Sequence, residues 1–212
     1  MAKNSVSLSV IRRLPRYHRF LKELLATGTV RISSKDLARK MRLSASQIRQ
    51  DLNCFGGFGQ QGYGYNVEAL YQEISHILGL DQQRTAILLG AGNLGKAISQ
   101  HMDFSSRGFT LVGVFDNNPA LIGQQVGELT ILDSKEIDVF CKAHGPSVAI
   151  LCIPKDAAIE VADKLIGLGI RGFWNFSHYD LLLDHQGIVV ENVHLGDSLS
   201  TLCCRLNRLE ED

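Results

Sequence analysis

The chain has 212 residues, of which 45% are hydrophobic and 21% are charged, a composition typical of globular proteins that bury a core. The 22 Lys and Arg balance the 22 Asp and Glu overall, but residues 1–80 carry 12 basic against 5 acidic side chains, and residues 81–212 carry 10 against 17. No apolar run reaches the roughly 18–20 residues of a membrane span, and charge interrupts the N-terminal segment too early for a secretory signal peptide. The uneven charge predicts a basic module that meets a polyanion, followed by an acidic module with a different task.

Three helices are predicted early in the basic module. Apolar residues at helical spacing predict a helix over residues 15–27, after a short leading segment, and Gly28 is typical of a helix end. Ser33 favours the start of a second helix, and Ser44 with Gln47 matches a capping box that opens a third. Because only about three residues separate the second and third helices, we expect a helix-turn-helix.

Residues 55–65 alternate aromatic side chains with five glycines, which predicts a hairpin whose tip approaches another surface closely. A further helix is predicted over residues 67–79. A helix-turn-helix followed by a hairpin is a winged helix, so residues 1–80 are predicted to bind DNA with the third helix in the major groove and the hairpin in the minor groove. The predicted major-groove contacts are Ser46, Gln47, Arg49 and Gln50, and the predicted backbone or minor-groove contacts are Arg13, Arg16, Tyr17, Arg19, Gly59, Gln60, Gln61 and Tyr63.

A nucleotide-binding motif opens the acidic module. The apolar strand 85–89 leads directly into a GxGxxG turn and a helix, and the next strand, 111–115, ends at Asp116, 21 residues beyond Gly95. In such a turn the backbone approaches a pyrophosphate at the helix N-terminus, while the acid accepts hydrogen bonds from a ribose. A carboxylate there repels a 2′-phosphate, so the predicted cofactors are NADH and NAD+. The predicted cofactor contacts are Gly90, Ala91, Gly92, Asn93, Leu94, Gly95 and Asp116, with Ile153, Pro154, Asn175, Phe176 and Ser177 near the nicotinamide half.

Strands and helices alternate through the rest of this module, over residues 133–143 (helix), 147–153 (strand), 156–168 (helix), 171–175 (strand) and 188–193 (strand). The alternation predicts an α/β fold, a Rossmann-type doubly wound parallel sheet over residues 84–194. In residues 195–212, leucines recur every three or four residues from Leu195 to Leu209. Such a stripe either packs on its own domain or docks on a partner, and so sharp a seam favours the partner.

The two modules together resemble the Rex family of redox-sensing transcriptional repressors over almost the whole chain. The resemblance rests on Arg13-Leu-Pro-Arg-Tyr17, Ser33-Ser34, Gln47-Ile-Arg49, Phe55-Gly56, Gly62-Tyr-Gly-Tyr-Asn66, Gly90 to Gly95, Phe115-Asp116, Gly169-Ile-Arg-Gly172, Asn175-Phe176 and Glu191-Asn-Val193. It implies a homodimer with a domain-swapped C-terminal helix, which binds double-stranded operator DNA with an inverted repeat. It also implies that the repressor leaves the operator when NADH rises relative to NAD+.

The chain departs from the Rex pattern at four places. Gln50 stands where many relatives have Lys, and Gln60-Gln61 stands where Lys or Arg is usual, so attraction to phosphates is reduced. His101 replaces a Tyr that helps to communicate the cofactor state, and His194 replaces a frequent Asp. We expect these histidines to alter the switch and to add pH dependence between about 6 and 7.5.

Two other classes of protein fit the sequence less well. An NAD-dependent dehydrogenase lacks room, because about 20 residues follow the sheet, and no Tyr is followed four residues later by Lys. A CoA-binding regulatory module would have no use for Asp116 as a ribose acceptor. We therefore expect no catalytic residues and no enzyme activity.

The five cysteines lie at no metal-ligand spacing. Free thiols in a reducing cytoplasm are expected, with no metal site and no membrane partner.

Overall fold

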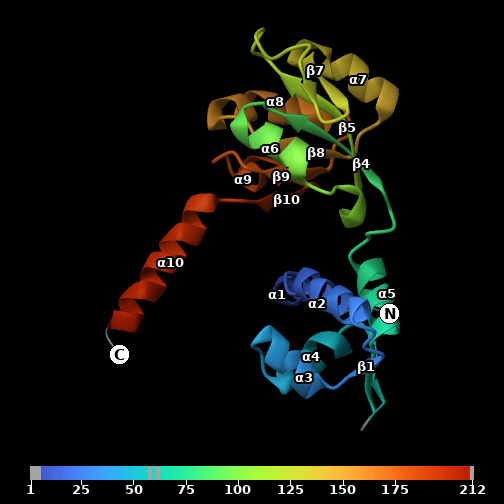
Figure 1. The fold of residues 1–212 in the computed structure, drawn as a ribbon. Coiled ribbons are helices and arrows are strands. Elements are labelled where there is room, and N and C mark those ends of the chain that lie inside the picture. The colour runs from blue at the N-terminus through green and yellow to red at the C-terminus, as the bar shows by residue number, and fades with distance from the viewer. Residues whose placement is uncertain (1–5, 57–58, 61–62, 211–212) are drawn as a thin grey trace. The chain divides into compact units, whose positions relative to one another are not determined.

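The computed structural model describes residues 6–56, 59–60 and 63–210. The chain divides into two compact units, unit 1 (Met1–Asp81) and unit 2 (Gln82–Asp212), and each is described by itself (Figure 1). None of the described helices combines the length and the apolar character that a membrane span requires.

Unit 1 is a helical domain with a small sheet. Its elements are α1 (Leu8–Ile11), α2 (Leu14–Ala26), β1 (Arg31–Ile32), α3 (Ser34–Met41), α4 (Ala45–Asn53), β2 (Gly59–Gln60), β3 (Gly64–Asn66) and α5 (Val67–Ile77). The antiparallel sheet has the order β1-β3-β2. The core between the helices includes Leu14, Leu21, Met41, Ile48 and Ile74, none of which is exposed. The predicted winged helix is confirmed.

The turn between α3 and α4 is fixed by local polar contacts. The Ser33 hydroxyl accepts a hydrogen bond from the Asp36 backbone N–H, and the Ser44 hydroxyl accepts one from the Gln47 N–H, so both helices begin where the sequence predicted. Arg42, the first of the three residues between the helices, lies in the left-handed region at φ 53°. The Gln47 side chain does not return to Ser44 as a full capping box requires, because it donates to Asp51.

The predicted hairpin is present as β2 and β3, with Gly59 opposite Tyr65 and Gln60 opposite Gly64. Gly64 has φ +70°, and a Cβ there would lie 2.6 Å from the carbonyl oxygen of Ile32, so β1 and β3 approach too closely for any other residue. Gln61, a predicted DNA contact, lies outside the described residues.

Unit 2 is built on a seven-stranded sheet. Its elements are β4 (Arg84–Leu89), α6 (Asn93–His101), β5 (Phe109–Asp116), β6 (Gln125–Val126), β7 (Leu129–Asp133), α7 (Ile137–His144), β8 (Val148–Leu151), α8 (Lys155–Gly167), β9 (Gly172–Asn175), α9 (Leu181–Asp184), β10 (Val189–Asn192) and α10 (Leu195–Glu210), with 3₁₀ turns at Ser105–Arg107 and Ser134–Glu136. The strand order is β10-β9-β8-β4-β5-β7-β6, and every pairing is parallel except that of β6 with β7. The predicted doubly wound sheet is confirmed.

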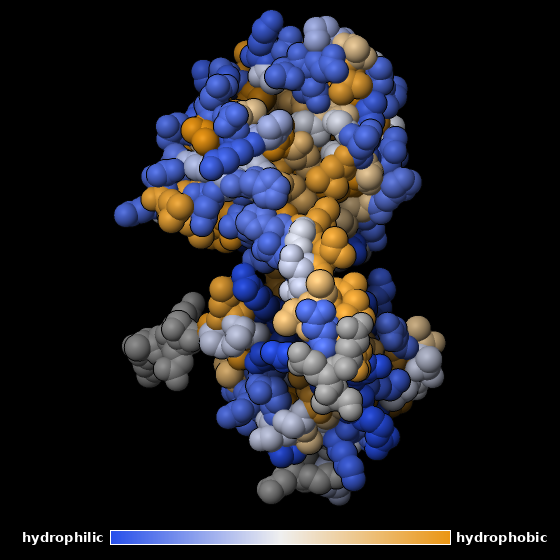
Figure 2. Space-filling view, turned by 90° about the vertical axis from the view of Figure 1, so that its left-hand side faces the viewer, coloured by the Kyte–Doolittle hydropathy of each residue, from blue (hydrophilic) through white to orange (hydrophobic). Residues whose placement is uncertain are grey.

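The two faces of the sheet are covered differently. Side chains such as Ile87 and Phe173 pack with α7 and α8 in one core. On the other face, residues such as Leu88 and Ile150 pack with α6. Part of this second face is a groove of about 670 Å³ next to Phe104 and Trp174. Hydrophobic side chains are also visible at the surface of the unit (Figure 2).

The last helix, α10, is exposed from Leu195 to Leu209, the leucines of its stripe included. The structure therefore does not show the stripe packed on its own domain, which was one of the two possibilities.

Candidate nucleotide-binding and DNA-binding sites

The glycine-rich turn between β4 and α6 needs its first and last glycines for packing. Gly90 has φ +95°, and a Cβ there would lie 2.4 Å from the carbonyl oxygen of Cys152. A Cβ on Gly95 would lie 1.8 Å from the carbonyl oxygen of Gly90. Gly92, the N-cap of α6, is exposed, and an added Cβ would meet nothing within 4 Å. The helix N-terminus is therefore open to an anionic ligand.

Asp116 is held against this turn. One of its carboxylate oxygens accepts a hydrogen bond of 2.6 Å from the Ala91 N–H, and the other accepts one of 2.8 Å from the Asn118 N–H. Each oxygen keeps acceptor capacity for one more donor. The carboxylate is thus positioned in advance for a hydroxyl pair such as that of a ribose.

A cavity of about 580 Å³ joins the turn to Asp116. The predicted residues that line it are Gly90, Gly92, Asp116, Ile153 and Pro154. Ala91 is buried and contributes its N–H to Asp116, whereas Asn93 and Leu94 are exposed in the first turn of α6.

Two of the three predicted cofactor contacts after β9 have buried side chains. Asn175 and Ser177 are buried. The Asn175 amide donates to the Tyr179 carbonyl oxygen and to the Asn192 side chain, and its oxygen accepts from the Ser177 N–H and hydroxyl. These two side chains hold the turn that follows the strand, and their contact with the cofactor stays a prediction. Phe176 is half-buried with its ring edge against Trp174, 4.7 Å between centroids.

The cavity also contains residues that the motif did not indicate. Among them are Asn117, Asn118, Ser134, Cys152, Glu160 and Lys164. Lys164 pairs with Asp138 at 3.0 Å, and burial raises the pKa of the Cys152 thiol to about 12. That thiol is therefore neutral and unreactive at physiological pH. Glu160 and Lys164 lie four residues apart on α8, a helical spacing that could have indicated them.

The exposed face of α4 carries Ser46, Arg49, Gln50 and Asn53. Ser46 lies three and four residues before Arg49 and Gln50, and Asn53 lies four and three residues after them, so the four positions share one side of the helix. Arg49 donates to the Ser34 hydroxyl at 3.1 Å. Asn53 was not predicted as a contact, although its helical spacing from Arg49 and Gln50 could have indicated it.

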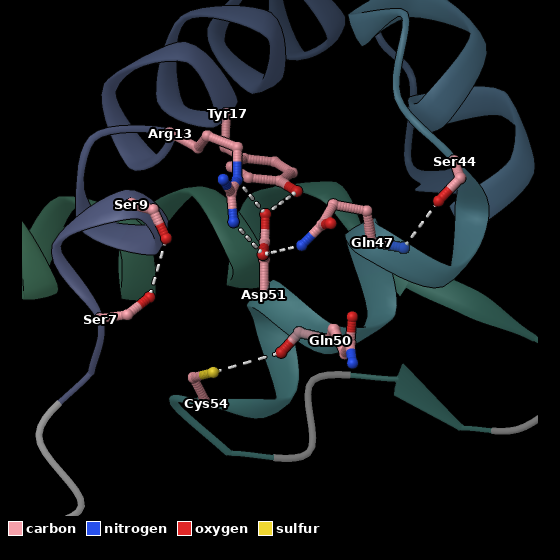
Figure 3. Close-up of polar contacts among 9 residues, drawn as sticks. All are labelled: Ser7, Ser9, Arg13, Tyr17, Ser44, Gln47, Gln50, Asp51 and Cys54. Atoms are coloured by element: carbon pink, nitrogen blue, oxygen red, sulfur yellow. Dashed lines mark hydrogen bonds and ion pairs between the residues drawn. The ribbon is translucent and has the colours of Figure 1, made fainter.

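A buried carboxylate lies behind this face (Figure 3). Asp51, which is not exposed, receives two hydrogen bonds of 2.7 Å from the Arg13 guanidinium, one of 2.9 Å from the Tyr17 hydroxyl and one of 2.8 Å from the Gln47 amide. Burial alone would raise the pKa of Asp51, but these donors outweigh it and the pKa lies below its usual value.

Two predicted DNA contacts are changed by this arrangement. Tyr17 is not exposed at all, so the prediction that it holds the DNA backbone is wrong for its side chain. Gln47 is half-buried, and its side-chain amide donates one hydrogen bond to Asp51. Arg19 and Tyr63 are exposed as a surface contact requires, while the Arg16 guanidinium donates to the Met41 carbonyl oxygen.

Among the described residues, no group of three or more His, Cys, Asp or Glu side chains is placed to hold a metal ion.

A winged helix joined to a dinucleotide-type fold defines a two-part regulator, with a DNA-binding unit and a nucleotide-binding unit. The family described as "Putative DNA-binding protein N-terminus" matches residues 5–53, and the family described as "CoA binding domain" matches residues 81–179. The redox-sensing transcriptional repressor Rex of Thermoanaerobacter pseudethanolicus is 52% identical over 208 residues, which cover 98% of this chain and 92% of that relative. The chain belongs to the Rex family of redox-sensing transcriptional repressors.

Solved structures agree with this assignment. A structure of RSP in complex with beta-NAD+ and operator DNA has a TM-score of 0.90 and 52% identity, over 97% of this chain and 94% of that chain. A structure of RSP in complex with beta-NADH has a TM-score of 0.88 and 48% identity, over 98% and 97%. The similarity to repressors confirms the expectation of a regulator rather than a dehydrogenase.

Proposed function

We propose that this protein represses transcription in the cytoplasm by binding an inverted-repeat operator as a homodimer, and that NADH releases it. The observation that carries the proposal is the position of Asp116. Its carboxylate is fixed on the glycine-rich turn of unit 2, in a chain whose unit 1 is a winged helix and whose relatives are redox-sensing repressors.

The turn and the cavity favour NAD(H). The exposed Gly92 lets a pyrophosphate reach the N-terminus of α6, and Asp116 accepts hydrogen bonds from the adenosine ribose. In NADPH or CoA a phosphate replaces one ribose hydroxyl, and the carboxylate would repel it. Lys164, the cation in the lining, is already paired with Asp138.

The reduced cofactor has a physical reason to act differently from the oxidised one. The dihydronicotinamide ring of NADH is neutral, whereas the ring of NAD+ is a cation whose burial costs desolvation. A ligand shifts an equilibrium only by its differential affinity for two states. NADH therefore stabilises a closed dimer that is incompatible with DNA, in which Leu195 lies close to the nicotinamide.

Unit 1 contacts the operator with its exposed basic surface. Ser46, Arg49 and Gln50 on α4 enter the major groove, and Arg19 contacts the phosphate backbone. The hairpin of Gly59, Gln60 and Tyr63 enters the minor groove.

The exposed leucines of α10 bind a second copy of the chain. We assign them to the groove on the open face of the partner's sheet, which has an apolar floor at Trp174 and is bordered by Arg84, Arg107 and Arg171. A two-fold dimer matches the symmetry of an inverted repeat.

The test is operator affinity measured by fluorescence anisotropy at fixed salt and fixed total NAD(H), as the NADH:NAD+ ratio is raised. We expect affinity to fall as the ratio rises, and we expect NADPH and CoA at the same concentrations to have little effect. An affinity that is indifferent to the ratio contradicts redox sensing, and release by CoA instead of NADH would favour the CoA-binding alternative.

A further inference from the structure

The carboxylate of Asp51 joins two elements of unit 1 that lie far apart in the sequence. Arg13 is the N-cap of α2, and Tyr17 lies in the first turns of that helix, while Gln47 and Asp51 are four residues apart on α4. All four side chains meet inside the unit, with the carboxylate at the centre (Figure 3).

The geometry of this cluster restricts how α4 can rotate on α2. Arg13 binds Asp51 through two parallel hydrogen bonds of 2.7 Å, from Nε and Nη2 to the two carboxylate oxygens. A bidentate arginine pair fixes direction as well as distance. Because Asp51 is fully buried, no water replaces a donor that moves away, so a change of helix orientation leaves a buried charge unpaired.

Two glutamines on α4 differ in burial and in hydrogen bonding. Gln47 is half-buried and donates to Asp51 at 2.8 Å. Gln50 is exposed, and within the described part of the chain its side chain has no hydrogen-bond partner. The two residues are three positions apart, yet the first is bound within the protein and the second faces outward.

We propose that Asp51 is a positioning residue that sets the orientation of the DNA-reading helix α4, and that Gln47 belongs to this positioning cluster and reads no base. The readers on α4 are then Ser46, Arg49, Gln50 and Asn53. This inference rests on the proposed DNA-binding function of unit 1.

The test compares the matched variants Gln47→Met and Gln50→Met in the full-length protein. Each is titrated against the operator and against a panel of operators with single base-pair changes, and the active fraction is measured by stoichiometric titration. Loss of one internal hydrogen bond in Gln47→Met should weaken binding to every operator by a similar factor of about fivefold. Gln50→Met should instead change the preference at one base pair.

A second variant, Asp51→Asn, removes the charge but not the shape. We expect a larger rise in the Kd of the active fraction, again equal across the panel, because the charge that pairs with Arg13 is lost and one of the two acceptor oxygens becomes an amide donor. A lower active fraction with an unchanged Kd in both Asp51→Asn and Gln47→Met would show a role in folding alone and overturn the inference. A changed preference at one base pair in Gln47→Met would overturn it as well. If the unaltered protein binds no operator, the proposed function fails instead.

Discussion

Gly92 and Gly95 lie three residues apart in the same turn, but different constraints apply to them. An added methyl on Gly95 would strike the carbonyl oxygen of Gly90 at 1.8 Å, whereas one on Gly92 would meet no protein atom within 4 Å. We expect Gly95→Ala to lower the free energy of unfolding of unit 2 by about 1–3 kcal/mol, as overpacking does. Gly92→Ala should leave it unchanged.

Gly92→Ala should instead weaken cofactor binding. Its methyl would occupy the space that a pyrophosphate needs at the N-terminus of α6, so we expect NADH affinity to fall by about tenfold or more, equivalent to 1.4 kcal/mol. Isothermal titration gives the affinity and thermal unfolding gives the stability. Operator binding by Gly92→Ala should persist but no longer respond to NADH, and an unchanged NADH affinity would place the pyrophosphate elsewhere.

At the scale of single residues, the sequence indicated the site residues whose role follows from a fixed spacing in a motif. The glycines of the turn and Asp116 belong to this group, because a strand, a tight turn and an acid at the end of the next strand define them locally. Tyr17 was misassigned because its side chain binds Asp51, which lies more than 30 residues away in the chain. A helical pattern alone does not tell a buried polar network from an exposed binding face.

The packing of α2 on α5 contains a histidine whose ionisation affects stability. His18 Nε2 lies 3.1 Å from the Ser75 hydroxyl, and its ring stacks on Tyr71 at 4.5 Å. Burial lowers the pKa of His18, and the charge of Lys22 lowers it further. The folded protein therefore favours the neutral ring more strongly than the unfolded chain does, for which the pKa is about 6.5.

The sign of the pH dependence follows from this lowered pKa. The stabilisation is fully present above the unfolded value of about 6.5 and is lost as the pH falls through it towards the folded pKa, because the unfolded chain then binds the extra proton. We expect His18→Gln to remove part of the stability loss between about pH 7 and pH 5, measured by thermal unfolding of the full-length protein. His76→Gln, which removes a histidine from an exposed position of the same unit, is the matched control. Equal slopes in the unaltered protein and His18→Gln would show that this ring does not contribute.

At the scale of elements, the helices and the central strands were predicted well, whereas two strands at one edge of the sheet were missed. The helix predicted over residues 156–168 is α8, at Lys155–Gly167. By contrast, β7 ends at Asp133 and α7 begins at Ile137, so the helix predicted from residue 133 begins too early. The strands β6 and β7 escaped prediction because two to five residues next to a glycine turn carry little periodic signal.

At the scale of the whole molecule, the uneven charge and the leucine stripe indicated two modules and a partner. The groove that we assign to this partner was not predictable, because it is lined by residues at the starts of several strands, such as Arg84, Arg171 and Val189. Those residues come together only when the sheet forms.

The leucine stripe of α10 allows a test of the proposed dimer. Leu202 and Leu206 are half-exposed on the described helix, at 51% and 50%, and two-fold association would bury them. We expect the double variant Leu202→Asn and Leu206→Asn to dissociate into monomers in sedimentation equilibrium. The control is Ser200→Asn with Cys204→Asn, which alters the opposite side of the same helix and should leave the dimer intact.

Loss of the dimer should in turn change how the protein reads DNA. A dimer binds the second half-site of an inverted repeat as an intramolecular event, so its affinity for the full operator exceeds that for a half-site by avidity. In the leucine variant, the affinities for the full operator and for an isolated half-site should become equal, while unit 1 still binds the half-site as before. A leucine variant that remains dimeric, or that still prefers the full operator, would show that a surface other than the α10 stripe joins the two copies.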